Sequence, residues 1–410
     1  MGRITDKREV WITGIGLASS LGADTEAHGA LFSGEPVEAS VDEDRYAPYP
    51  IHPLAEIDFG RQIPKKSDLR QMEAWQRIGV YAAGLALTDA GVAGDSALLD
   101  RTHLAVAAGS GERDTKVDCD VLERLDQRGD AAVLAKEVLP GALRPTLFLA
   151  QLSNMLAGNI SIVHSVTGSS RTFMGEEMAG LAAIENAFRR IQAGQSDIVL
   201  AGGALNAERE DLLLGYEIGH NLWRGAHRPV WARAREGGGF TPGSVGAFLV
   251  LEERSHAEAR GAAPYAKISA LETERTGRQP GDVTRALSEL IARLGVPIPT
   301  GPLPVLSGAS GVAPITEEEL SFLDDLTADG HAPITRAYGS LIGHGVEAHL
   351  PAGIAFAALA LRHGQLPPPS EADDIELPLT GAIDRVLVTG VGHWRGEGLA
   401  LLERVAEKTA

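Results

Sequence analysis

One stretch in the middle of the chain constrains the fold more than any other: a strand, a sharp turn and a buried helix between residues 159 and 194. Residues 159–166 are rich in β-branched side chains, which predicts a strand. From Ala179 to Ile191 apolar residues recur at helical spacing, which predicts a buried helix. Glu176 and Glu177 stand at the start of that helix, where unpaired N–H groups and the helix dipole stabilise an anion. We therefore expect a reactive or charge-binding site at this turn.

The composition sets limits on what the protein binds. At 410 residues with 44% hydrophobic side chains, the chain suits a large α/β unit or two fused domains. Its formal net charge of −18 argues against nucleic acid as a partner. No apolar run approaches the length of a membrane span, so we expect a cytoplasmic protein. A single cysteine, Cys119, excludes a disulfide framework or a multi-cysteine zinc site within the chain.

Strands and helices alternate along the rest of the sequence. We expect strands over residues 9–17, 103–109, 197–203, 247–253 and 303–306, and helices over 72–91, 122–138, 282–294 and 351–361. The order around the turn predicts a strand-helix-strand crossover in a parallel sheet. Residues 10–16 (VWITGIG) and 386–392 (VLVTGVG) share one pattern, which indicates a duplicated α/β half. We expect the halves to comprise residues 1–253 and 254–410.

Several motifs resemble those of the β-ketoacyl-acyl carrier protein synthases. Gly168 and Gly180 match the two glycines that flank the family's nucleophilic cysteine, and further matches are the segments Ser19-Ser20-Leu21-Gly22, Asn154-Met155-Leu156-Ala157-Gly158, 197–203 (DIVLAGG) and Arg228-Pro229. The resemblance spans most of the chain and decays in its second half. It implies a thiolase-like, five-layered αβαβα fold of two similar halves, a dimer, and an acyl carrier protein as partner. An acidic carrier would need a basic patch here, for which Lys65, Lys66 and Arg70, or Arg189 and Arg190, are candidates.

The positions that carry chemistry in that family are changed in this sequence. Glu177 stands at the cysteine position, Ala309 where the first histidine is expected, and Gly339 in place of the lysine. His344 matches the second histidine, while His393 takes the place of the phenylalanine in a Gly-Phe-Gly-Gly loop that helps to form the oxyanion hole. A condensing synthase needs the thiolate, two histidines and that hole. The resemblance therefore indicates a degenerate site.

Glu177 and His344 each allow more than one interpretation. Glu177 could mimic the acylated nucleophile or act as an acid or base, but we favour a structural carboxylate held by the helix dipole and backbone N–H groups. His344 is interpreted first as an inherited structural residue and second as a remnant of catalysis. With His349 five residues on and no ligand pair nearby in the sequence, we expect no zinc site and no cofactor.

The function implied by the resemblance is that of a chain-length-factor-like subunit. Such a subunit does not condense, pairs with an active ketosynthase and helps to set the acyl chain length. Within the family the chain looks most like the second ketosynthase of rhizobial clusters that make very-long-chain fatty acids for lipid A. The alternatives are an active 3-oxoacyl carrier protein synthase, a malonyl carrier protein decarboxylase with atypical catalytic residues, and a homodimeric acyl-binding scaffold.

Overall fold

The computed structural model describes residues 8–34, 37–128, 130–143, 147–371 and 374–406. Ten strands form one hydrogen-bonded series in the order β3-β2-β4-β5-β1-β6-β10-β9-β7-β8. Their bounds are β1 Val10–Ala18, β2 His103–Ala107, β3 Ser170–Phe173, β4 Ile198–Leu205, β5 Val245–Glu253, β6 Ala266–Glu274, β7 Gly301–Ser307, β8 His331–Ala337, β9 Arg385–Val391 and β10 Glu397–Glu403.

The strand series is a repeat of one topology. Strands β1–β5 lie in the order third, second, fourth, fifth, first, and β6–β10 lie in that same order when read from the opposite edge. Each half has parallel pairs among its second, third and fourth strands and antiparallel pairs elsewhere. The halves meet where β1 pairs antiparallel with β6 over three residues, from Val10 with Ile268 to Ile12 with Ala266. Two similar halves are thus confirmed.

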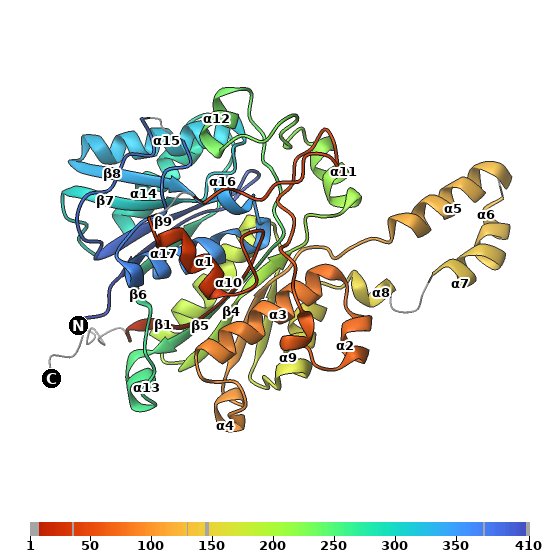
Figure 1. Cartoon of the computed structure of the whole chain (residues 1–410), viewed down its shortest axis with the longest axis horizontal. Coiled ribbons are helices and arrows are strands. Elements are labelled where there is room, and N and C mark those ends of the chain that lie inside the picture. The colour runs from red at the N-terminus through yellow and green to blue at the C-terminus, as the bar shows by residue number, and fades with distance from the viewer. Residues whose placement is uncertain (1–7, 35–36, 129, 144–146, 372–373, 407–410) are drawn as a thin grey trace.

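Helices cover both faces of each half. We call strands β1–β5 the first sheet and strands β6–β10 the second sheet; the short pairing of β1 with β6 joins their edges. The helices are α1 Thr25–Gly29, α2 Lys66–Gln71, α3 Ala74–Asp89, α4 Ser96–Leu99, α5 Thr115–Arg128, α6 Ala131–Val133, α7 Leu139–Ala142, α8 Leu147–Ala150, α9 Asn154–His164, α10 Glu177–Gln192, α11 Glu210–Ile218, α12 Val230–Arg235, α13 Arg254–Ala259, α14 Asp282–Arg293, α15 Ala313–Ala328, α16 Gly339–Ile342 and α17 His349–His363, with a short 3₁₀ turn η4 at Val346–Ala348. Figure 1 shows how they surround the strands.

Three apolar cores account for the layers. One core joins α10 and α17 to facing sides of both sheets, and alternate residues of β4, such as Val199 and Ala201, belong to it. The other side of the first sheet, including Ile198 and Leu200, packs on α3 and α9. The outer side of the second sheet packs on α14 and α15. This alternation of side chains across each sheet gives the expected five-layered αβαβα arrangement.

Two details of the sequence analysis were wrong. Residues 159–166 do not form a strand, because residues up to His164 belong to α9. Leu156, Ala157 and Ile160 recur at helical spacing and are buried in the core shared with α3, so packing overrides the β-branched composition. The strand before the turn is instead the polar β3 at the sheet edge. The repeated pattern of residues 10–16 and 386–392 also matches strands that are not equivalent, since β1 is first in its half and β9 fourth.

A helical arm leaves the layered body between β2 and α9. Figure 1 shows α5, α6 and α7 reaching well away from the rest of the molecule. The arm exposes large apolar side chains, including Leu122 at 63% and Phe148 at 69%. In the part of the chain that the structure describes, no helix is long and apolar enough to cross a membrane.

Candidate functional site

The turn before α10 presents Glu177 to the interior. Glu176, the residue before the helix, has φ 56° and ψ −133°, an unusual conformation for a residue other than glycine. Glu177 begins the helix and is 5% exposed. One turn later, Gly180 lets η4 approach, because a Cβ there would lie 2.5 Å from the carbonyl oxygen of Glu347. The glycine of the motif therefore brings the second half of the chain against the start of α10.

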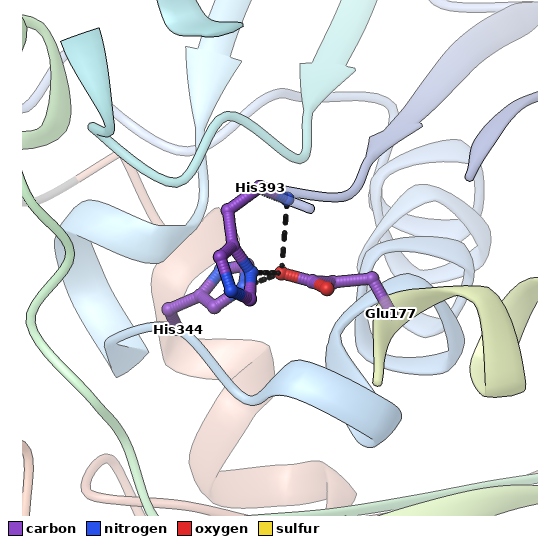
Figure 2. Close-up of side chains that lie close together, drawn as sticks. All are labelled: Glu177, His344 and His393. Atoms are coloured by element: carbon purple, nitrogen blue, oxygen red, sulfur yellow. Dashed lines mark hydrogen bonds and ion pairs between the residues drawn. The ribbon is translucent and has the colours of Figure 1, made fainter. Parts of the chain in front are cut away.

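Two histidines from the second half converge on the Glu177 carboxylate, as Figure 2 shows. His344 Nε2 lies 2.7 Å and His393 Nδ1 lies 2.6 Å from the same oxygen, Oε1. The backbone N–H of His393 also donates to Oε1 at 3.3 Å. A carboxylate only accepts hydrogen bonds, so His344 Nε2 and His393 Nδ1 each carry a proton and donate it to Oε1. The partners of Glu177 are thus two imidazoles and a distant N–H group, and the expected N–H groups of its own helix are not among them.

The three members of the cluster differ in charge, as the directions of their pKa shifts indicate. Burial would raise the pKa of the Glu177 carboxyl, but the charge of His393 and the hydrogen bonds from both histidines hold that pKa well below its usual range. Burial lowers the pKa of His344, against the influence of Glu177. For His393 the charge of Glu177 outweighs burial and raises its pKa. The arrangement is therefore a buried ion pair of Glu177 with His393, flanked by neutral His344.

Ala309 and Gly339 lie near each other beside the cluster. A Cβ on Gly339 would be 3.5 Å from the carbonyl oxygen of Ala309 and 3.5 Å from the ring of His349. The His349 ring in turn lies 4.2 Å, centroid to centroid, from that of His344. Its Nδ1 accepts the N–H of Gly345, and burial holds its pKa well below the usual value. A neutral imidazole from α17 thus packs where a lysine and a histidine are missing from the sequence.

A cavity of about 720 Å³ reaches the cluster from the molecular surface. His393, Glu176, Tyr216 and Glu347 are among its lining residues. Burial, together with the charges of Glu177 and Glu176, raises the pKa of the Glu347 carboxyl to about 7. Burial also raises the pKa of the Glu176 carboxyl, which is half-buried and lines the cavity. The cavity lining therefore includes acidic and aromatic side chains next to His393.

Comparison with known proteins decides the family. Residues 7–257 match the family described as "Beta-ketoacyl synthase, N-terminal domain", which is more than half of the chain. The chain belongs to the β-ketoacyl synthase family. The 3-oxoacyl-[acyl-carrier-protein] synthase 2 of Vibrio cholerae is 29% identical over 272 residues, 64% of this chain and 62% of that protein. The match thus spans less than two thirds of that synthase. The synthase 2 of Rhizobium meliloti is 27% identical over 90% of this chain and 89% of its own length.

Other β-ketoacyl synthase relatives belong to polyketide systems. The tetracenomycin polyketide synthase ketoacyl synthase beta subunit of Streptomyces glaucescens is 26% identical over 88% of this chain and 87% of its own length. Among solved structures, the ishigamide ketosynthase/chain length factor gives a TM-score of 0.78 at 21% identity, covering 98% of this chain and 100% of that chain. A β-ketoacyl synthase from Burkholderia phymatum gives 0.76 at 19% identity, covering 97% and 100%. These structures confirm the ketosynthase fold.

The sequence analysis identified the three members of the cluster but missed other residues that line the adjoining cavity. Glu177, His344 and His393 were singled out by family position, but nothing in their spacing shows that they meet. Glu347 and Tyr216 were not expected at the site, whereas Glu176 was expected at the turn but not in the lining of a cavity. A signal for Glu347 did exist, since the run 345–349 (GVEAH) places a carboxyl and an imidazole at the start of an otherwise apolar helix. Cys119 is exposed on α5 in the arm.

Proposed function

We propose that this protein is a non-condensing, chain-length-factor-type subunit of a fatty acid or polyketide elongation system. One observation carries the proposal. Glu177, at the nucleophile position, has no thiol, and its carboxylate already accepts hydrogen bonds from the rings of His344 and His393 and from the backbone N–H of His393. In a condensing synthase that N–H would face the developing oxyanion. Here the protein's own side chain takes that donor, so the site resembles one in which an acyl group is already bound.

The proposal includes a ketosynthase partner and an acyl carrier protein. Strand β3 is a sheet edge of only four residues, and such an edge needs a partner or protection. Ile162 and Met174, on either side of it in the chain, are 68% and 63% exposed. Together with the apolar side chains of the arm, they offer a surface that a second ketosynthase-like chain would cover. One solved relative at 16% identity is titled as a ketosynthase in complex with its type II polyketide acyl-carrier protein.

The finer placement among elongation systems also belongs to the proposal. The rhizobial pathway to very-long-chain fatty acids of lipid A is one candidate, supported by a Rhizobium meliloti synthase among the relatives. Polyketide relatives such as the granaticin protein of Streptomyces violaceoruber, 27% identical over 88% of this chain, support the other.

The decisive experiment compares the chain alone with the chain plus a partner. We expect the purified protein to make no 3-oxoacyl product from acyl and malonyl carrier protein, and to copurify with a co-expressed ketosynthase that has an intact Cys-His-His set. Glu177→Cys alone should not restore condensation, because Ala309 and Gly339 still lack their functional groups. Product above a heat-treated control would overturn the proposal.

A malonyl carrier protein decarboxylase is the second candidate, favoured by the acid-base groups that line the cavity. It predicts that the wild type releases carbon dioxide from malonyl carrier protein and that Glu177→Gln loses this release while staying folded. If the protein is a non-condensing subunit, neither the wild type nor Glu177→Gln should release carbon dioxide. A partner-free carbon dioxide assay therefore separates the two functions.

A further inference from the structure

The cluster at the start of α10 contains the donor atoms of a metal site. Glu177, His344 and His393 each offer one ligand atom, these atoms lie within 4.8 Å of one another, and all three residues are buried. Two imidazole nitrogens and a carboxylate oxygen are a common ligand set for zinc and related first-row ions. We propose that Glu177, His344 and His393 bind a divalent transition-metal ion, with zinc as the best match.

Unpaired polar atoms of Glu177 and His344 support the presence of a bound cation. Oε1 accepts three donors, whereas Oε2 is buried and finds no partner among the described residues. A buried carboxylate oxygen without a partner costs free energy. Nδ1 of His344 is also buried and unpaired within the described chain. Nδ1 of His344 can therefore take the proton that its Nε2 must give up when it binds a cation, while Oε2 supplies a second oxygen. The charged His393 releases its Nδ1 proton to solvent when that nitrogen binds the ion.

The spacing is close to what a zinc ion requires. Ligand atoms around a tetrahedral zinc lie about 3.3 Å apart, given zinc–ligand distances of about 2.0 Å. The two nitrogen–oxygen separations in the protein are 2.7 and 2.6 Å. An opening of less than about 1 Å would admit the ion, and rotation about side-chain bonds suffices for that. His393 is the member of the cluster that lines the cavity, so there is open space next to its side chain for such a movement.

The surroundings favour a cation. Glu176 and Glu347 line the same cavity as His393, so three carboxyl groups approach the two histidines. Three arginines also line the cavity: Arg113, Arg209 and Arg395. Arg113 forms an ion pair with Asp118, Arg209 forms one with Asp211, and the charge of Arg395 acts on Glu176. Three protein ligands leave a fourth position for water or a ligand that enters through the cavity. The bound ion would join the first turn of α10 to two segments of the second half.

Metal content is the direct test, and it needs neither substrate nor partner. Untagged full-length protein would be incubated with zinc, desalted and analysed by mass spectrometry for metal. We expect one equivalent per chain, a higher melting temperature with zinc, and visible absorption on replacement of zinc by cobalt. Glu177→Gln and His393→Gln should each lower the affinity at least about tenfold. His220→Asn is the matched control, since His220 is exposed, has φ 52° and lies outside the cluster.

Two results would overturn the metal site. One is a wild-type protein that retains no zinc after desalting, which would show that the cluster does not hold the ion. The other is equal zinc retention by the wild type and by both ligand variants, which would place the ion elsewhere. Circular dichroism of each variant establishes that a loss of metal is not a loss of fold. Neither result bears on the condensation assay, so this inference and the proposed function can fail separately.

Discussion

Gly180 lies so close to Glu347 that a methyl group on its Cα would come within 2.5 Å of the Glu347 carbonyl oxygen. We predict that Gly180→Ala lowers the free energy of unfolding by about 1–3 kcal/mol, because α10 and η4 cannot both keep their positions. Gly158→Ala in α9 is the control, since a Cβ there meets nothing within 4 Å and alanine favours a helix. Urea unfolding of the two variants should give changes of opposite sign, and equal changes would contradict this packing.

Neutralising Glu177 should destabilise the fold more than neutralising its neighbour. We predict that Glu177→Gln, measured by urea unfolding with a chelator present, lowers stability by about 2–4 kcal/mol, because His393 loses the carboxylate that balances its charge in a buried site. Glu176→Gln should be neutral or stabilising, since burial and the charge of Glu177 disfavour ionised Glu176. A loss below about 1 kcal/mol for Glu177→Gln would indicate the simple helix-terminal carboxylate expected from the sequence.

The exposed apolar residue next to the sheet edge should control assembly. Ile162→Asp, on the surface of α9, is predicted to weaken the association of the chain with its partner without lowering the stability of the isolated chain. The comparison variant is Leu377→Asp, which is 46% exposed in the second half of the chain. Light scattering and copurification measure the effect. Unchanged assembly by Ile162→Asp would move the interface away from α9 and β3.

A buried histidine far from the cluster should make the fold sensitive to acid. His28 is fully buried, its Nδ1–H donates to the carbonyl of Asp24 at 2.6 Å, and its Nε2 accepts from Ser19 at 2.8 Å. Burial lowers the pKa of His28 below 6.5, so the unfolded chain takes up this proton first as the pH falls. Stability that is present above pH 6.5 is therefore lost below it, by at most about 1.4 kcal/mol per pH unit for this group.

The variant His28→Asn isolates that contribution from those of other buried histidines. Asparagine can still donate to the Asp24 carbonyl but cannot take up a proton. Unfolding measured between pH 7 and pH 5 should show a shallower loss of stability in His28→Asn than in the wild type. Parallel curves would mean that His28 is not neutral in the folded protein at these pH values.

Local patterns predicted the elements better than they predicted their contacts. The buried strands β4 and β5 and the helices α3 and α17 follow apolar patterns that suit only one structure. Residues 159–166 misled, because isoleucine and valine suit both a strand and a helix, and contact with α3 decided between them. The boundary between residues 253 and 254 falls between β5 and α13 and stays a prediction as a domain limit.

The site could be predicted only through its positions in a family. His344 lies 167 positions and His393 lies 216 positions after Glu177 in the sequence. No local spacing therefore shows that both histidines donate to one oxygen atom of Glu177. Charge compensation depends on the distance in space and on burial, which a linear pattern does not contain. The partners of Glu177 therefore differ from the helix N–H groups that its position in the sequence suggests.

The two halves of this molecule each complete their own sheet, but neither completes the cluster. Glu177 comes from the half that contains β1–β5, and both histidines come from the half that contains β6–β10. A recombinant chain that joined one half to the corresponding half of a cysteine-bearing relative would bring together a carboxylate and a pocket that never evolved to neutralise it. A change at any one of positions 177, 344 and 393 consequently leaves a buried charge or a buried hydrogen-bonding atom of the other two without its partner.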